Sequence, residues 1–107
     1  MTDQQIVLTL ATKVMGWKRY GETEFWYGDN GNLFDSSFWN PLQNIAGAWQ
    51  VVEKLGESFW EVNIDLGSKS PNARVVIYRT YTRKDGHVAI ASTVQEAICG
   101  AALRAIA

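Results

Sequence analysis

The first apolar positions of the chain recur at the spacing of an α-helix. They lie three or four residues apart, at Val7, Leu10, Ala11 and Val14. This spacing places them on one side of a helix. Thr2 and Gln5 precede them as a capping box, in which a hydroxyl and an amide satisfy each other's free backbone groups. Because Gly16 interrupts the run, the pattern predicts a helix over residues 3–15.

Residues 21–34 change to a pattern that is typical of a β-hairpin. Two aromatic-rich segments, 24–27 and 32–34, flank the sequence Asp29-Asn30-Gly31. Small polar side chains and glycine tolerate the positive φ angles of a tight turn. The pattern predicts two strands and a turn, and it leaves open whether this hairpin joins the main sheet.

A second helical pattern follows Asn40 and Pro41, which have the form of a cap and a first-turn proline. Its apolar positions share one predicted face, formed by Ile45, Ala48, Trp49, Val52 and Leu55. Gly56 ends the pattern, so we expect a helix over residues 42–55.

Three strands are predicted next, in an antiparallel meander. Residues 59–66 alternate, and their apolar side carries Trp60, Val62, Ile64 and Leu66. Such alternation indicates a strand with one buried face. Residues 74–83 are rich in β-branched residues and tyrosine, which favour strands. A turn at residues 84–86 then leads back into a third strand over residues 87–91.

The last predicted helix, residues 93–107, is apolar on nearly all sides. It opens with a second capping box, formed by Thr93 and Glu96. Two apolar stripes run along it, at Val94, Ile98, Ala101, Ala102 and Ala105, and at Cys99, Leu103 and Ile106. Such a helix is buried on two sides, or is buried on one side and paired with another subunit on the other. Its alanines allow close approach, so we expect it to lie tightly against the sheet.

Together these elements predict a single α+β domain over residues 1–107. In this class an antiparallel β-sheet is packed with α-helices, here in an α/β/α sandwich. The first hairpin and the meander supply the antiparallel strands, and the helices pack on them.

Four sequence blocks carry a family resemblance. They are Lys13-Val-Met-Gly-Trp-Lys18, Trp39-Asn-Pro41, Ile45-Ala-Gly-Ala-Trp-Gln-Val-Val-Glu-Lys-Leu55 and Thr93-x-x-Glu-Ala-Ile-Cys-Gly-Ala-Ala-Leu103. In these blocks and their order, the chain resembles the phage ABA sandwich domain family over nearly its whole length. The resemblance implies an antiparallel sheet layered between helices, in a phage or prophage protein of the bacterial cytoplasm. It implies no activity and no catalytic residues. One departure is Leu42-Gln43-Asn44, where family members often have a serine or threonine followed by an acidic residue.

Composition narrows the function classes. With 107 residues and a formal net charge of -1, the chain has the length of one domain and no overall attraction for nucleic acid or an anionic membrane. One cysteine, Cys99, rules out an internal disulfide, and one histidine, His87, argues against a zinc site. No export signal is recognisable, and no apolar run approaches the roughly 18 residues of a membrane span. We expect a cytoplasmic protein without metal, cofactor or small-molecule substrate.

Tryptophans are the first candidates for a binding surface. Trp49 and Trp60 lie on the apolar faces of predicted elements, so we expect both in the core. Trp17, Trp26 and Trp39 lie at element ends or in the hairpin, where an aromatic ring caps a core and stays partly exposed. They form the predicted exposed aromatic patch, since such patches mark binding partners.

A basic group on the second meander strand is the other candidate surface. Its members are Arg74, Arg79, Tyr81, Arg83 and Lys84. Charge and stacking suit a nucleic-acid backbone, but we favour pairing of the arginines with polar residues of the neighbouring strand. The order helix, three strands, helix is also that of the double-stranded RNA-binding domain. Such domains hold phosphates with lysines at the start of the last helix, where this chain has Glu96, which repels phosphate.

The residues give little support to catalysis. His87, Asp85 and Cys99 are the one grouping that suggests a nucleophile, but this thiol lies in an apolar helix without a basic neighbour. Four carboxylates surround the hairpin, at Glu22, Glu24, Asp29 and Asp35. They lack the spacing of a calcium loop. We therefore expect a non-enzymatic phage accessory protein that acts through protein contacts, with a partner or as a homodimer. The alternative is a nucleic-acid-binding module.

Overall fold

A computed structural model describes residues 1–23, 25–28, 32–67, 72–81 and 86–107 of the chain. Its helices are α1 (Asp3–Thr9), α2 (Ile45–Glu57) and α3 (Val94–Ile106), with a π-helical segment at Leu10–Val14 and a 3₁₀ turn at Ser36–Phe38. Its strands are β1 (Lys18–Arg19), β2 (Phe25–Tyr27), β3 (Leu33–Asp35), β4 (Trp60–Asp65), β5 (Ala73–Arg79) and β6 (His87–Ala91).

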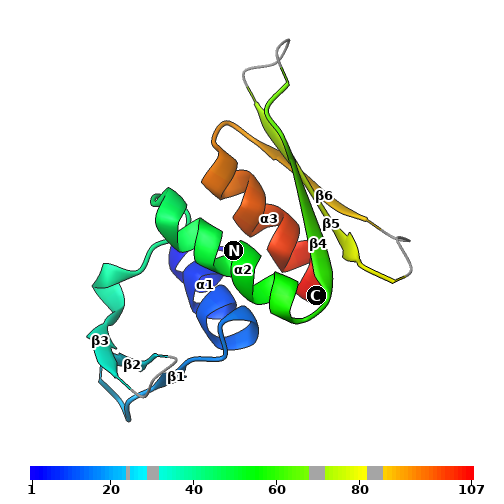
Figure 1. Ribbon diagram of the computed structural model, residues 1–107. Helices are drawn as coiled ribbons and strands as arrows, with labels where there is room; N and C mark the ends of the chain where they lie inside the picture. The colour runs from blue at the N-terminus through cyan, green and yellow to red at the C-terminus, as the bar shows by residue number, and fades with distance from the viewer. Residues whose placement is uncertain (24, 29–31, 68–71, 82–85) are drawn as a thin grey trace.

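The six strands form two separate antiparallel sheets. One has the order β1-β2-β3 and the other β4-β5-β6. The first hairpin therefore does not join the meander, and the helices lie between the two sheets (Figure 1). The predicted class, α+β with antiparallel strands packed with helices, is confirmed. Within that class, the described helices all lie on one side of the larger sheet instead of on both sides.

The N-terminal helix begins as predicted and changes its winding before it ends. The backbone N–H of Gln5 donates to the Thr2 hydroxyl at 3.2 Å, and the N–H of Thr2 donates to Gln5 Oε1 at 2.9 Å, so the capping box is confirmed. From Leu10 to Val14 the helix is π-helical. The hydroxyls of Thr9 and Thr12 donate to carbonyls four residues earlier, a pairing that competes with regular helical bonding.

Helix α2 begins three residues later than the sequence predicts. The Asn40 side chain accepts a hydrogen bond from the N–H of Leu42 at 3.1 Å and thereby holds a turn. The helix cap is Asn44, whose Oδ1 accepts from the N–H of Ala46 at 2.8 Å. Both asparagines have the chemistry of a cap, so the prediction of residue 42 as the start was wrong.

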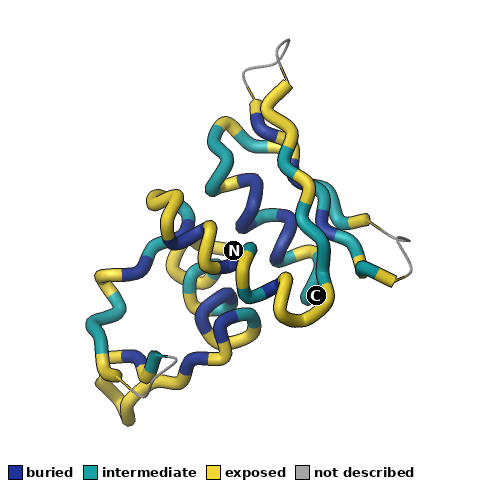
Figure 2. The backbone as a smooth tube through the Cα atoms, in the orientation of Figure 1, coloured by how far each residue is buried: buried dark blue, intermediate teal, exposed yellow. Residues whose placement is uncertain are grey.

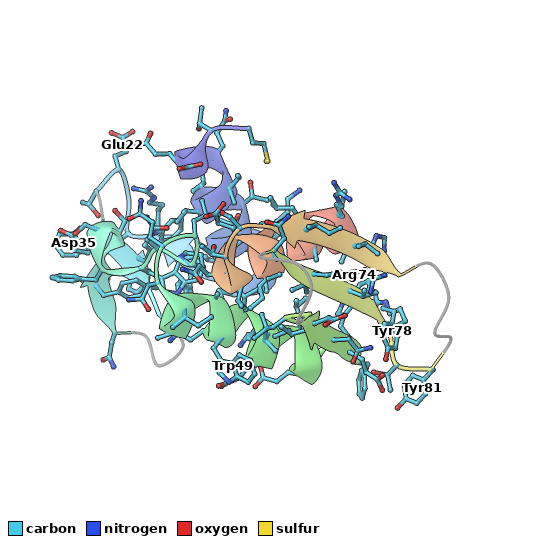
Figure 3. The ribbon with its side chains drawn as sticks, turned by 90° about the horizontal axis from the view of Figure 1, so that it is seen from above. Glu22, Asp35, Trp49, Arg74, Tyr78 and Tyr81 are labelled. Atoms are coloured by element: carbon cyan, nitrogen blue, oxygen red, sulfur yellow. The ribbon has the colours of Figure 1, made fainter. Side chains whose placement is uncertain are left out.

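The buried side of α2 is rotated away from Trp49. Its buried residues are Gly47, Ala48, Val51 and Leu55. At Gly47 the helix approaches the chain so closely that an added Cβ would lie 3.2 Å from the Cα of Pro41. Two residues further along a helix a side chain points to the opposite side, so Trp49 is 49% exposed and points outward (Figure 3). The expectation that Trp49 belongs to the core was wrong.

The register of the larger sheet separates its two faces. Val62 lies opposite Ile77, and Val75 lies opposite Ala89. These residues face α2 and α3, together with Trp60, which is half-buried against the core as expected. The other face carries the alternate residues Glu61, Asn63, Asp65, Arg74, Val76, Tyr78, Val88 and Ile90. No described helix covers this outer face.

At the open end of the hairpin formed by β4 and β5, both strands are shorter than the sequence predicts. Phe59 has φ +65°, which a strand does not allow, so β4 begins one residue later. Thr80 and Tyr81 already form a turn after β5. The remainder of the predicted second strand, residues 82–83, lies outside the described part of the chain.

Helix α3 is buried on two sides within the chain itself. It packs against β5 and β6 on one side and against α2 on the other, and Ala97, Ala101 and Ala102 are completely buried. An added Cβ at Gly100 would lie 3.1 Å from the Cβ of Ala89, so the helix approaches the sheet as closely as expected. Of the two alternatives for this helix, burial within one chain is the one observed (Figure 2).

Burial of α3 also determines the chemistry of Cys99. This side chain is completely buried, and burial, with a smaller contribution from the Glu96 charge, raises the pKa of its thiol from 9.0 to about 12. A thiol with such a pKa is protonated at neutral pH and is a poor nucleophile.

Enlarging an alanine of α3 should destabilise the fold. In Ala101→Leu the extra side-chain atoms have no space between sheet and helices, so we expect a loss of about 1–3 kcal/mol in the free energy of unfolding. Urea denaturation followed by circular dichroism measures it. The control is Ala46→Leu at an exposed position of α2, for which we expect a change within about 0.5 kcal/mol. Equal stability of the two variants would contradict the close packing of α3.

The raised pKa of Cys99 should appear as a pH dependence of stability. In the unfolded chain the thiol ionises near its ordinary value of 9.0 and in the folded chain at about 12. The contribution of the un-ionised thiol to the free energy of unfolding is therefore complete below pH 9 and is lost as the pH rises toward 12. The free energy of unfolding should fall by up to about 1.4 kcal/mol per pH unit more steeply in the wild type than in Cys99→Ala. Parallel slopes in alkaline urea titrations would show that the buried thiol is not responsible.

Candidate interaction surface

The inner side of the small sheet carries an aromatic layer that is part of the same buried cluster as Leu10, Ala48 and Val51 of the helices. The ring of Trp17 packs edge-on against Phe34 at 5.0 Å and against Trp39 at 4.8 Å between centroids. Trp39 also donates from Nε1 to Oε1 of Gln50 on α2 at 2.7 Å. The guanidinium of Arg19 lies 4.6 Å from the centroid of the Trp26 ring. These contacts join the small sheet to the helices.

The three tryptophans predicted to form an exposed aromatic patch belong to this inner layer. Trp17, Trp26 and Trp39 are only 7%, 2% and 6% exposed, so that prediction was wrong. The reason lies in the alternation of β2, where Trp26 points inward and its two neighbours point outward. A large ring at an element end is buried when its element packs against the core, as the small sheet does here against the helices.

The opposite side of the small sheet carries a group of exposed apolar and aromatic side chains. Register places its side chains on one face: Tyr20, Phe25, Tyr27 and Leu33. They are 46%, 42%, 39% and 48% exposed. The rings of Tyr20 and Tyr27 meet edge-on at 5.3 Å. We call these four residues the outer aromatic face.

Among the described residues of the small sheet, charge on the outer aromatic face is sparse and balanced. Lys18 lies opposite Tyr27, and Asp35 lies opposite Phe25. The backbone N–H of Ser37 and then its hydroxyl bind the Asp35 carboxylate and hold its pKa below the ordinary value. The acid therefore stays ionised at neutral pH. One positive and one negative charge beside four apolar side chains suit a protein partner better than a polyanion.

A cleft of about 760 Å³ opens on the other side of the small sheet, next to α1. It is lined by Thr2, Asp3, Gln4, Gln5, Val7, Leu8, Arg19, Trp26, Ser36, Ser37, Trp39 and Asn40. Its two tryptophans are almost completely buried, so they present little apolar area to a ligand. The outer aromatic face is the stronger candidate surface for this reason.

The predicted basic group is not gathered on one face in the part of it that the structure describes. Arg74 points to the outer face of β5, whereas Arg79 shares the helix-facing side with Ile77. The Arg79 guanidinium lies 3.9 Å from the centroid of the Trp60 ring and donates to the carbonyl of Ser58 at 3.2 Å. Tyr81 is exposed beside Phe59, at 5.7 Å between rings (Figure 3). Arg83 and Lys84 lie outside the described residues.

The described residues bring together no catalytic grouping of the kind considered from the sequence. His87 packs against Trp60 at 6.0 Å between rings, Cys99 is buried in α3, and Asp85 lies outside the described residues. Of the carboxylates around the hairpin, Glu24 and Asp29 are also outside them. Within the described part of the chain, no three histidine, cysteine or acidic residues form a group able to hold a metal ion. None of its helices is long and apolar enough to cross a membrane.

The outer aromatic face was missed by the sequence reasoning, although a signal for it exists. In the segment Phe25-Trp26-Tyr27 the three aromatic residues must alternate between two faces of a strand. If the middle ring is buried, the two flanking rings are exposed. The prediction grouped the tryptophans by their size and did not apply this alternation to residues 25–27.

Comparison with known proteins agrees with this architecture. The family model of the phage ABA sandwich domain matches residues 8–103. The chain is also similar to the 2.0 Å crystal structure of a phage protein from Bacillus cereus ATCC 14579, with a TM-score of 0.69 and 26% sequence identity. That similarity covers 96% of this chain and 90% of the Bacillus chain. Among the curated proteins no match was found. The match over residues 8–103 shows that this chain belongs to the phage ABA sandwich domain family.

Proposed function

We propose that this protein is a non-enzymatic phage accessory protein that binds another protein through its outer aromatic face, in the cytoplasm of the host bacterium. The observation that carries the proposal is the exposure of Tyr20, Phe25, Tyr27 and Leu33 on one face. Isolated exposed apolar residues are common on protein surfaces, but a contiguous group of this kind usually marks a contact. Tyrosine and phenylalanine are also enriched at protein interfaces.

Nucleic-acid binding is the second candidate, and the aromatic side chains alone do not exclude it. Bases stack on such rings, but affinity for a nucleic acid also requires several cations that neutralise phosphates. The described outer aromatic face has Lys18 and, against it, Asp35. The described cations of β5 lie on the other sheet, and one of them, Arg79, is engaged with Trp60. These placements favour a protein partner.

Self-association through α3 loses its support, because this helix is buried within one chain. A homodimer would have to use another apolar surface, and the outer aromatic face is one such surface among the described residues. Light scattering over a range of protein concentrations separates a second copy from a different partner protein.

Replacement of the outer aromatic face should abolish partner binding without unfolding the protein. In a pull-down from a lysate of phage-infected host cells, we expect the wild type to retain a partner protein. The double variant Phe25→Ser with Tyr27→Ser should no longer retain it. Both side chains are partly exposed, and interface aromatics commonly contribute 2 kcal/mol or more, which is about thirtyfold in affinity. The matched control is Phe38→Ser with Ile90→Ser, two exposed apolar residues elsewhere. Calorimetry with the purified partner gives the affinity of each variant.

The two candidate functions differ in their response to salt and nuclease. An apolar protein contact should survive nuclease treatment and change little between low and physiological salt, whereas phosphate contacts weaken steeply. Binding through this face would be refuted if the partner protein were no longer retained after nuclease treatment. It would also be refuted if the control variant lost the partner protein to the same extent as the double variant of the outer aromatic face.

A further inference from the structure

Strand β4 is an edge of the larger sheet, and one side of its backbone is free to pair. The N–H of Thr80 donates to the carbonyl of Phe59 at 3.0 Å. Backbone groups alternate in direction along an antiparallel strand, so residues 61, 63 and 65 bond to β5. Trp60, Val62 and Ile64 then point their N–H and C=O groups away from β5, and no described residue bonds to them.

The two edges of this sheet differ. At the opposite edge, the carbonyl of Val88 on β6 points away from β5 and accepts a hydrogen bond from the Arg104 guanidinium of α3. This contact places a bulky cation where another strand would have to pair, which protects that edge. Among the described residues no such side chain reaches the backbone of β4. Pairing with an added strand is therefore directed to one edge.

The side chains of β4 determine which side chains an added strand would need in order to pair with it. On the outer face the strand carries two acids, Glu61 and Asp65, with Asn63 between them. Of these, Asp65 lies opposite Arg74, and Asn63 donates to the hydroxyl of Tyr78 at 2.9 Å. On the helix-facing side the strand carries Trp60, Val62 and Ile64, which are partly exposed. Directly paired residues on neighbouring strands interact best when charges are opposite and apolar side chains meet.

We infer that the β4 edge binds an extended segment of a partner protein in which basic residues alternate with β-branched apolar residues. The segment adds a fourth strand next to β4. Its basic side chains lie beside Glu61 and Asp65, and its apolar side chains continue the row of Val62 and Ile64. A second copy of β4 is the less favourable occupant, because it would bring two further acids to the same edge. This inference does not depend on the outer aromatic face.

Binding of a model peptide tests the inference directly. We expect the full chain to bind a fluorescein-labelled Lys-Val-Lys-Val-Lys-Val peptide, measured by fluorescence anisotropy. A peptide of the same composition in the order Lys-Lys-Lys-Val-Val-Val should bind less tightly, because it lacks the alternation. Amide exchange followed by NMR should show new protection at Trp60, Val62 and Ile64 and no change at Val88.

Two variants separate backbone pairing from charge. In Glu61→Gln with Asp65→Asn the affinity for the alternating peptide should fall roughly three- to tenfold, while the amide side chain keeps the turn at Gly67. Val62→Pro removes one outward N–H without touching the bonds to β5, and should weaken binding roughly tenfold. Ile90→Ser, on the protected edge, is the control and should bind as the wild type does.

Several results would overturn the inference. They are equal binding of the alternating and block peptides, protection that appears at β6, and unchanged affinity in the charge variant. Protection of Trp60, Val62 and Ile64 that grows with protein concentration without peptide would assign the edge to a second copy instead. Because none of these measurements involves Phe25 or Tyr27, failure here leaves the proposed function of the outer aromatic face untouched.

Discussion

Close packing on both sides of α3 is the constraint on which the rest of the structure depends. The helix lies between the larger sheet and α2, and its alanines Ala97, Ala101 and Ala102 are completely buried. Protein interiors are packed without voids, so small side chains at the centre draw sheet and helices close together. The buried side chains that β5 and β6 present to α3 are accordingly small or β-branched, namely Ala73, Val75, Ile77 and Ala89, and the ring of Trp60 on β4 is only half-buried.

The buried aromatic residues of the chain lie at the small sheet instead. Trp17, Phe34 and Trp39 form the part of the core that lies at the small sheet, where their rings pack edge-on. A sheet of three very short strands has two faces, and only one of them packs against this core. The outer aromatic face is what remains on the other side, and it gives the molecule an apolar surface that its own described residues do not cover.

Local signals along the chain predicted most of the elements. Thr2 and Thr93 mark helix starts because cap and backbone lie within three residues of each other. The capping box is complete at Thr2, whereas at Thr93 the hydroxyl accepts from the N–H of Glu96 and donates to the Glu96 carboxylate, so the second predicted box forms only in part. Alternation predicted β4, since one face of the strand is buried and the other is not. The start of α2 was misplaced because Asn40 and Asn44 are both competent caps, and local chemistry does not choose between them.

The sequence by itself determined the α+β class, the order of the elements and the close packing of the alanine-rich last helix. It did so because caps, periodicity and side-chain size act over a few residues. Only the tertiary structure decided which aromatic residues are buried. The close approach at Gly47 turns Trp49 outward, and packing of the small sheet against the helices encloses the three tryptophans that we expected on the surface. The burial of an aromatic side chain depends on which elements pack against each other, and this packing involves residues far apart in the chain.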